Sequence, residues 1–146
     1  MYKHAFNSHR KGDKLAAERW ARTAKHLARA FSHESKIAYL EAHSTDLPFL
    51  EGATGEEFGL RERSDTTADL LNSVSDHIPP GLSRMPPQMN HYLARARNHL
   101  ETLRDPEYRH ELLRAERIGA AHEYGRVLEC MALAYEAENK RTSKAA

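Results

Sequence analysis

Ten histidines stand in this chain of 146 residues, and imidazole nitrogens commonly bind zinc, copper and iron in proteins. No two of these histidines are four residues apart, and the zincin pattern His-Glu-x-x-His does not occur. One Glu-x-x-His sequence is present, from Glu107 to His110. A di-iron carboxylate site in a helical bundle needs two such pairs and two further glutamates. We therefore expect no metal site and no cofactor.

Arginine and histidine also recur together, with four to six residues between them. The pairs are Arg117/His122, Arg104/His110, Arg19/His26 and Arg84/His91. This spacing resembles the catalytic motif of the HEPN ribonucleases, although 15 arginines and 10 histidines give about three such pairs by chance. Arg104 and His110 fit best, because the polar residue Asp105 follows the arginine. An HEPN-like ribonuclease, with these two residues converging across a dimer, is a minor alternative.

Other catalytic patterns are missing from the sequence. There is no Gly-x-Gly-x-x-Gly, no phosphate loop and no nucleophile elbow. The lone cysteine, Cys130, precedes Met131, Ala132 and Leu133 in an apolar stretch, which favours an inert core thiol over a nucleophile. A single cysteine also excludes an internal disulfide framework and a cysteine-based zinc site. The sequence therefore predicts that this protein is not an enzyme.

Basic residues form the clearest candidate binding site. Asp13 can cap a helix over residues 14–31, in which Trp20, Ala24, Leu27 and Phe31 recur on one apolar face. The opposite face is basic, and we predict it as the partner-binding surface. Its residues are Arg19, Arg22, Lys25, His26 and Arg29. The alternative is an ordinary solvated face above a core stripe.

Charge is distributed unevenly along the chain. Residues 1–36 carry nine Lys/Arg and three Asp/Glu, residues 37–76 carry two and nine, and residues 77–146 carry eleven and nine. Such asymmetry is typical of a basic region that binds nucleic acid or an acidic protein. It is equally compatible with a basic segment that packs beside the acidic one, so that the two fields largely cancel.

A helix-turn-helix provides the second function hypothesis. Residues 27–32 followed by residues 35–41 are similar in their order of small, apolar and polar positions to the phage-repressor motif, although the turn lacks Gly and is one residue short. Ser32 and Ser35 could cap a second helix, and the face that carries Ile37 and Leu40 does not continue the apolar face of residues 20–31. We therefore expect a break near Ser32. A DNA-binding regulator using residues 14–43 would then direct Ser35, Lys36 and Tyr39 toward bases.

Residues 44–63 are the least regular part of the sequence, with Pro48 and three glycines among apolar residues. Three interpretations stay open for this segment. Residues 47–50 could plug the core, could pair with residues 57–61 as a small β-hairpin, or could be exposed for docking.

The rest of the chain predicts helices. We expect one over residues 65–77 with a stripe of Thr67, Leu71, Val74 and Ile78, and a stiff proline-rich connection over residues 79–87. A heptad seam follows, made of Met89, Leu93, Ala96, Leu100 and Leu103. Asp105-Pro106-Glu107 is a helix-start signal and predicts a helix over residues 106–139. One face of this helix is apolar and consists of Leu113, Ala120, Tyr124, Val127, Met131 and Ala134. Gly119 and Gly125 predict a bend or a close helix approach.

These observations together predict an all-α, single-domain bundle of four to five helices, with room for one small β-hairpin in residues 44–63. The domain comprises a basic helical region 1–43, an irregular acidic segment 44–63, a helical region 64–139 and a short polar tail 140–146. No apolar run is long enough to cross a bilayer and no signal peptide is readable, so we expect a cytoplasmic protein.

The function expected from this bundle is binding. The protein would dock on a protein or nucleoprotein complex as an adaptor, inhibitor or regulator, as small accessory proteins of phages and plasmids often do. Nucleic acid could bind through the basic N-terminal helix, whereas no membrane partner is expected. The oligomeric state is not predicted.

Overall fold

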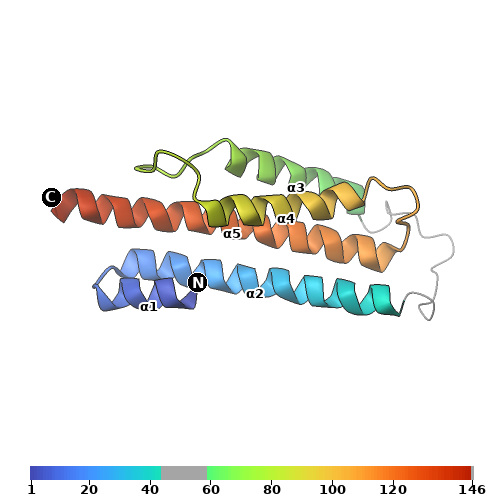
Figure 1. Ribbon diagram of the computed structural model, residues 1–146, viewed down its shortest axis with the longest axis horizontal. Coiled ribbons are helices and arrows are strands. Elements are labelled where there is room, and N and C mark those ends of the chain that lie inside the picture. Colours follow the sequence, from blue (N-terminus) through green and yellow to red (C-terminus); the bar gives the residue numbers. More distant parts are fainter. Residues whose placement is uncertain (44–58, 146) are drawn as a thin grey trace.

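Most of the described chain is helical, and the helices run along the long axis of the molecule (Figure 1). The computed structural model describes residues 1–43 and 59–145, and the side chains of residues 1–43 and 59–140. The described helices are α1 (Tyr2–Arg10), α2 (Lys14–Ala42), α3 (Leu60–Ser75), α4 (Pro87–Thr102) and α5 (Glu111–Ala145). The all-α prediction is confirmed.

The small hairpin is not supported. Leu60 and Arg61, which would end its second strand, lie in the first turn of α3, and no strand occurs within residues 1–43 and 59–145. The core plug and the docking segment concern residues 47–50, which lie outside the described residues.

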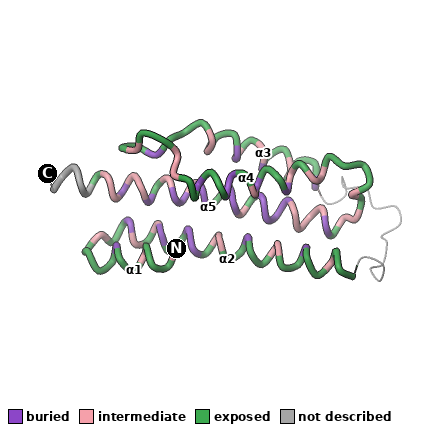
Figure 2. Tube along the Cα trace, in the orientation of Figure 1, coloured by how far each residue is buried: buried purple, intermediate pink, exposed green. Residues whose placement is uncertain are grey.

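The long helix α5 is the centre of the bundle. It packs against α2 on one side and against α3 and α4 on the other, and α1 folds back along the first half of α2 (Figure 1). Buried positions concentrate on the surfaces that these helices turn toward one another (Figure 2). The apolar face predicted for α5 is confirmed, since Tyr124, Val127, Met131 and Ala134 are fully buried.

The predicted break near Ser32 is wrong, because α2 is continuous from Lys14 to Ala42. Asp13 does cap it, and the Asp13 carboxylate accepts from the backbone N–H of Ala16 at 3.0 Å. Residues 32–35 contain neither Gly nor Pro, so nothing in them opposes a helix. The apolar face shifts at this point for a different reason: Ile37 enters a second cluster with Leu113 and Ala120.

Three further boundary predictions need correction. Helix α3 begins five residues earlier than expected, because Leu60 is already buried in the core. The Asp105-Pro106-Glu107 sequence forms a turn, in which the Asp105 carboxylate accepts from the Glu107 backbone N–H at 3.0 Å, and α5 begins only at Glu111. Phe31 is 45% exposed and Ile78 is exposed as well, so neither is a core residue.

The two glycines of α5 allow close helix approach. A Cβ atom on Gly119 would lie 2.6 Å from the His33 ring of α2, and one on Gly125 would lie 2.6 Å from the Leu70 side chain of α3. The helix continues through both positions without a break. Close approach, one of the two predicted roles, is therefore confirmed at both glycines.

None of the helices in the described residues combines the length and the apolar composition that a bilayer crossing requires.

The central position of α5 leads to a stability prediction. Met131→Ala removes a fully buried side chain from the core and should lower the free energy of unfolding by about 2–5 kcal/mol, measured by urea denaturation. Leu133→Ala, two residues further along the same helix and 43% exposed, is the matched control and should cost less than about 1 kcal/mol. Equal losses in the two variants would contradict this packing.

Candidate functional site

Polar side chains connect α2 to α5 along most of their common length. Nδ1 of His26 donates to the Glu123 carboxylate at 2.6 Å, and Nδ1 of His33 donates to Glu116 at 2.5 Å. Nearer the N-terminus of α2, the Trp20 indole N–H donates to Glu138 at 2.7 Å. The partner's number falls as the α2 number rises, as expected for antiparallel helices, and the contacts hold α2 in one alignment.

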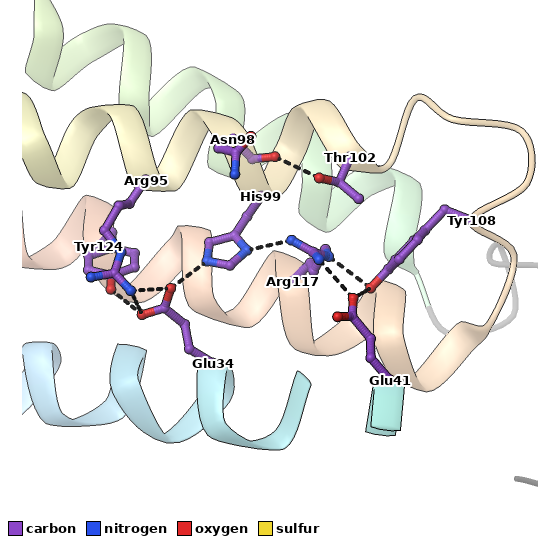
Figure 3. A network of polar contacts seen from close by, with 9 residues as sticks. All are labelled: Glu34, Glu41, Arg95, Asn98, His99, Thr102, Tyr108, Arg117 and Tyr124. Atoms are coloured by element: carbon purple, nitrogen blue, oxygen red, sulfur yellow. Dashed lines mark hydrogen bonds and ion pairs between the residues drawn. The ribbon is translucent and has the colours of Figure 1, made fainter. Parts of the chain in front are cut away.

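Glu34 of α2 is the centre of a larger polar network (Figure 3). Nη2 of Arg95 lies 2.7 and 2.8 Å from its two carboxylate oxygens, Nε2 of His99 lies 3.0 Å from Oε2, and the Tyr124 hydroxyl donates to Oε1. Arg95 and His99 belong to α4 and Tyr124 to α5. One carboxylate therefore joins three helices.

His99 has a defined tautomer in this network. Its Nδ1 lies 3.1 Å from Nη1 of Arg117, and a guanidinium can only donate hydrogen bonds. Nδ1 must therefore accept, and the ring proton sits on Nε2, which donates to Glu34. Both ring nitrogens are satisfied only while the imidazole is neutral.

Arg117 extends the network toward the connection between α4 and α5 (Figure 3). Its Nε donates to the Tyr108 hydroxyl at 2.8 Å and its Nη2 donates to Glu41 at 2.9 Å, while its guanidinium lies 5.0 Å from the Tyr108 ring centroid. The Tyr108 hydroxyl in turn donates to Glu41 at 3.1 Å. These contacts fix the C-terminal end of α2 to the segment that precedes α5.

The pKa shifts of Glu34 and His99 agree with an ionised Glu34 and a neutral His99. Burial alone would raise the pKa of the Glu34 carboxyl, but hydrogen bonds from Tyr124, Arg95 and His99 outweigh it and hold the pKa below its usual value. Burial lowers the pKa of His99, and the positive charges of Arg117 and Arg95 add to this effect against the opposing influence of Glu34. Glu34 is therefore ionised and His99 neutral at pH 7.

The polar groups of this network are engaged with one another. His99 and Tyr124 are buried, each polar group bonds to another member, and neither Glu34 nor His99 lines any of three surface hollows formed by the described residues. A general base needs a free lone pair that faces a substrate. The lone pair on His99 Nδ1 faces Arg117 instead.

The predicted basic face divides into two sets. Arg19 and His26 turn toward α5: Nη1 of Arg19 donates to the Leu133 carbonyl at 2.7 Å, and His26 contacts Glu123. Arg22, Lys25 and Arg29 are exposed, and Lys36 continues their line two turns further along α2. Arg22 pairs with Glu18 at 2.7 Å, with both side chains more than half exposed.

Three of these cations, Lys25, Arg29 and Lys36, have no hydrogen-bond or ion-pair partner among the described residues. Three acidic side chains of α5 contact His26, His33 and Trp20, and within the described residues none of α5 pairs with Lys25, Arg29 or Lys36. Since α3 packs on α4 and α5, its carboxylates do not cover the row either. Packing inside the described bundle therefore does not cancel the basic charge of α2.

The arginine–histidine pairs proposed for RNA cleavage are not joined by any contact in the described residues. Arg117 contacts His99, Tyr108 and Glu41, whereas His122 is exposed. Arg104 pairs with Glu101 at 3.3 Å on the surface, and His110 is turned inward with both ring nitrogens lacking a described partner.

Cys130 is buried, and burial raises the pKa of its thiol.

The Glu34 network itself was not predicted from the sequence. Its residues are 34, 41, 95, 99, 108, 117 and 124, which are spread over four segments. One signal was available: His99 falls beside Ala96 and Leu100 on the predicted seam of α4, where an unpaired histidine would be costly. That position calls for a polar partner from another helix, although it does not identify Glu34.

No group of three or more His, Cys, Asp or Glu side chains suitable for a metal ion occurs among the described residues. Comparisons of the chain with protein families, with curated proteins and with solved structures give no significant match. Its function is therefore argued from its own geometry.

Glu34 should dominate the stability of the contact between α2 and the rest of the bundle. Glu34→Gln removes the charge that Arg95 and Tyr124 bind, and should lower the unfolding free energy by about 2 kcal/mol in urea denaturation. The control is Glu18→Gln on the same helix, whose exposed pair with Arg22 contributes only about 0.3–0.5 kcal/mol. A loss at Glu34 no larger than at Glu18 would show that the network contributes little.

The His99 tautomer predicts a dependence of stability on pH. The folded state lowers the pKa of His99, so below about pH 6.5 the unfolded chain takes up this proton first and stability falls, by at most about 1.4 kcal/mol per pH unit. His99→Gln removes this contribution, and the difference in unfolding free energy between wild type and variant should shrink as the pH falls from 7.5 to 5.5. The control Leu133→Ala removes no titratable group, and its difference from the wild type should stay constant over this range. A constant difference for His99→Gln would contradict the neutral tautomer.

Proposed function

We propose that this protein is a non-enzymatic binding protein that docks an acidic protein surface on the exposed face of α2, as an adaptor, inhibitor or regulator. The observation that carries the proposal is the row of Arg22, Lys25, Arg29 and Lys36. These four cations lie on one side of a continuous helix, and three of them have no described partner. The proposal of a non-enzymatic role is supported by the full engagement of the buried acid and base groups in the Glu34 network.

The row is suited to binding because it is long and held in place. Arg22 and Lys36 are fourteen residues apart on α2, about 21 Å at 1.5 Å per residue. The opposite side of the helix is fixed to α5 and α4 through His26, His33 and Glu34. A partner therefore meets cations on a rigid backbone, and less ordering entropy is lost on binding.

An apolar groove at one end of the row favours a protein over DNA. It has a volume of about 440 Å³ and is lined by Ser32, Ser35, Lys36, Tyr39, Leu40, Leu112 and Glu116. Tyr39 is 62% and Leu112 45% exposed. Protein interfaces combine an apolar centre with a polar rim, whereas phosphate backbones are bound mainly through charge. The continuous α2 also provides no helix-turn-helix to place in a DNA groove.

Charge reversal tests this docking face. A triple variant with Arg22, Lys25 and Arg29 replaced by Glu should keep its far-UV circular dichroism and melting temperature, because all three side chains are exposed. In affinity capture from a lysate of the source cells, quantified by mass spectrometry, it should lose at least ten-fold of the protein that the wild type retains.

The control carries the same change in net charge elsewhere, through replacement of exposed Arg84, Arg104 and Arg109 by Glu. It should retain the same protein as the wild type. Equal capture by both triple variants, or equal loss in both, would refute docking on α2. Retention of nucleic acid instead of protein, with an affinity for duplex DNA that falls steeply with salt, would favour the DNA-binding alternative.

A further inference from the structure

A second feature lies on the other side of α5, away from the basic row of α2. It is a hollow of about 840 Å³ between α3, α4 and the first turn of α5. Its apolar floor includes Leu60 and Leu71, which are almost completely buried, and the partly buried Leu100. A volume of this size is typical of sites for small organic molecules.

Four arginines from different parts of the chain line this hollow. Arg61 comes from α3, Arg97 from α4, Arg104 from the residues just after α4, and Arg114 from α5. Among the described residues that line the hollow, two carry a carboxylate, Asp65 and Glu101, and Glu101 already pairs with Arg104 at 3.3 Å. The lining therefore carries an excess of positive charge.

Two of the arginines are free to bind and a third is held in position. Arg61 and Arg97 have no hydrogen-bond or ion-pair partner among the described residues. Arg114 is only partly exposed, and its Nη1 donates to the carbonyls of Leu103 at 3.2 Å and Tyr108 at 3.0 Å. Those bonds fix the guanidinium plane and leave Nη2 and Nε outside them.

We propose that this hollow is a binding site for a small amphipathic anion, with a phosphate, sulfonate or carboxylate group on an apolar body. The planar guanidinium groups match such anionic groups through paired N–H donors. The leucine floor would remove the apolar body from water, a gain of roughly 25 cal/mol for each Å² buried. The arginines would bind the anionic group and the leucines the apolar body of one ligand. Neither a bare inorganic ion nor a neutral apolar compound would therefore make both sets of contacts.

The test uses two fluorescent probes with nearly the same aromatic body. 8-Anilinonaphthalene-1-sulfonate carries the anionic group and N-phenyl-1-naphthylamine lacks it. The folded wild-type protein should bind the sulfonate at one saturable site by titration calorimetry and fluorescence, and at least ten-fold more tightly than the amine. Phenyl phosphate and benzoate should displace the sulfonate, and their relative strength would identify the preferred anionic group. Inorganic phosphate should displace it far less well.

Variants connect this binding to the hollow. Replacing both Arg61 and Arg97 by Gln should weaken sulfonate binding at least ten-fold, and Ala68→Phe, which places a ring in the space beside Leu71, should abolish it. The matched control replaces Arg22 and Arg29 of α2 by Gln and should change the affinity less than two-fold. Equal binding of the two probes, unchanged affinity in the Arg61 and Arg97 variant, or no saturable binding would each refute the site. None of these outcomes depends on partner docking at α2.

Discussion

The carboxylate of Glu34 is the interaction on which the arrangement of the bundle depends. Helix α2 packs directly on α5 but reaches α4 only through side chains, and Glu34 provides this link by binding Arg95 and His99 together with Tyr124 of α5. A half-buried charge is costly unless several donors satisfy it. Here three residues do so. The cost of removing Glu34 from water is therefore offset only when all three helices are in place, which makes the contact a condition for their assembly.

The neutral state of His99 extends this dependence along the bundle. Nδ1 of His99 accepts from Arg117, so the ring proton stays on Nε2, which donates a hydrogen bond to Glu34. This hydrogen bond therefore depends on the position of Arg117, which Tyr108 and Glu41 hold. The two ends of the network together carry two arginines and two glutamates, so its net charge is zero with neutral histidine. This balance lowers the cost of placing so many polar groups between the helices.

The sequence predicted those features that depend on local pattern. The apolar face of α5, the seam of α4 and the Asp13 cap follow from residue spacing, and all three are present.

Features that depend on distant partners were missed or misread. The shift of apolar residues at Ile37 looked like a helix break because its partners, Leu113 and Ala120, are more than seventy residues away. Asp105-Pro106-Glu107 has the composition of a helix start, but Tyr108 is held by Glu41 and Arg117, so α5 begins later. Residue spacing placed Arg22, Lys25 and Arg29 correctly on the basic face. It could not show that His26 turns toward Glu123 and Arg19 toward the Leu133 carbonyl, so that neither belongs to the exposed face.

The glycines of α5 determine how the helices beside it are aligned. The His33 ring occupies the space that a side chain at position 119 would fill, and Leu70 does the same at position 125. Sliding α2 by one helical turn, about 5.4 Å, would bring that ring against Ala115 or Glu123, where a Cβ atom stands in the way. Leucine- and alanine-rich helices otherwise tolerate several alignments, because one apolar contact resembles the next. Two missing side chains, on faces that meet different neighbours, therefore select a single alignment of α2 and of α3 on the same central helix.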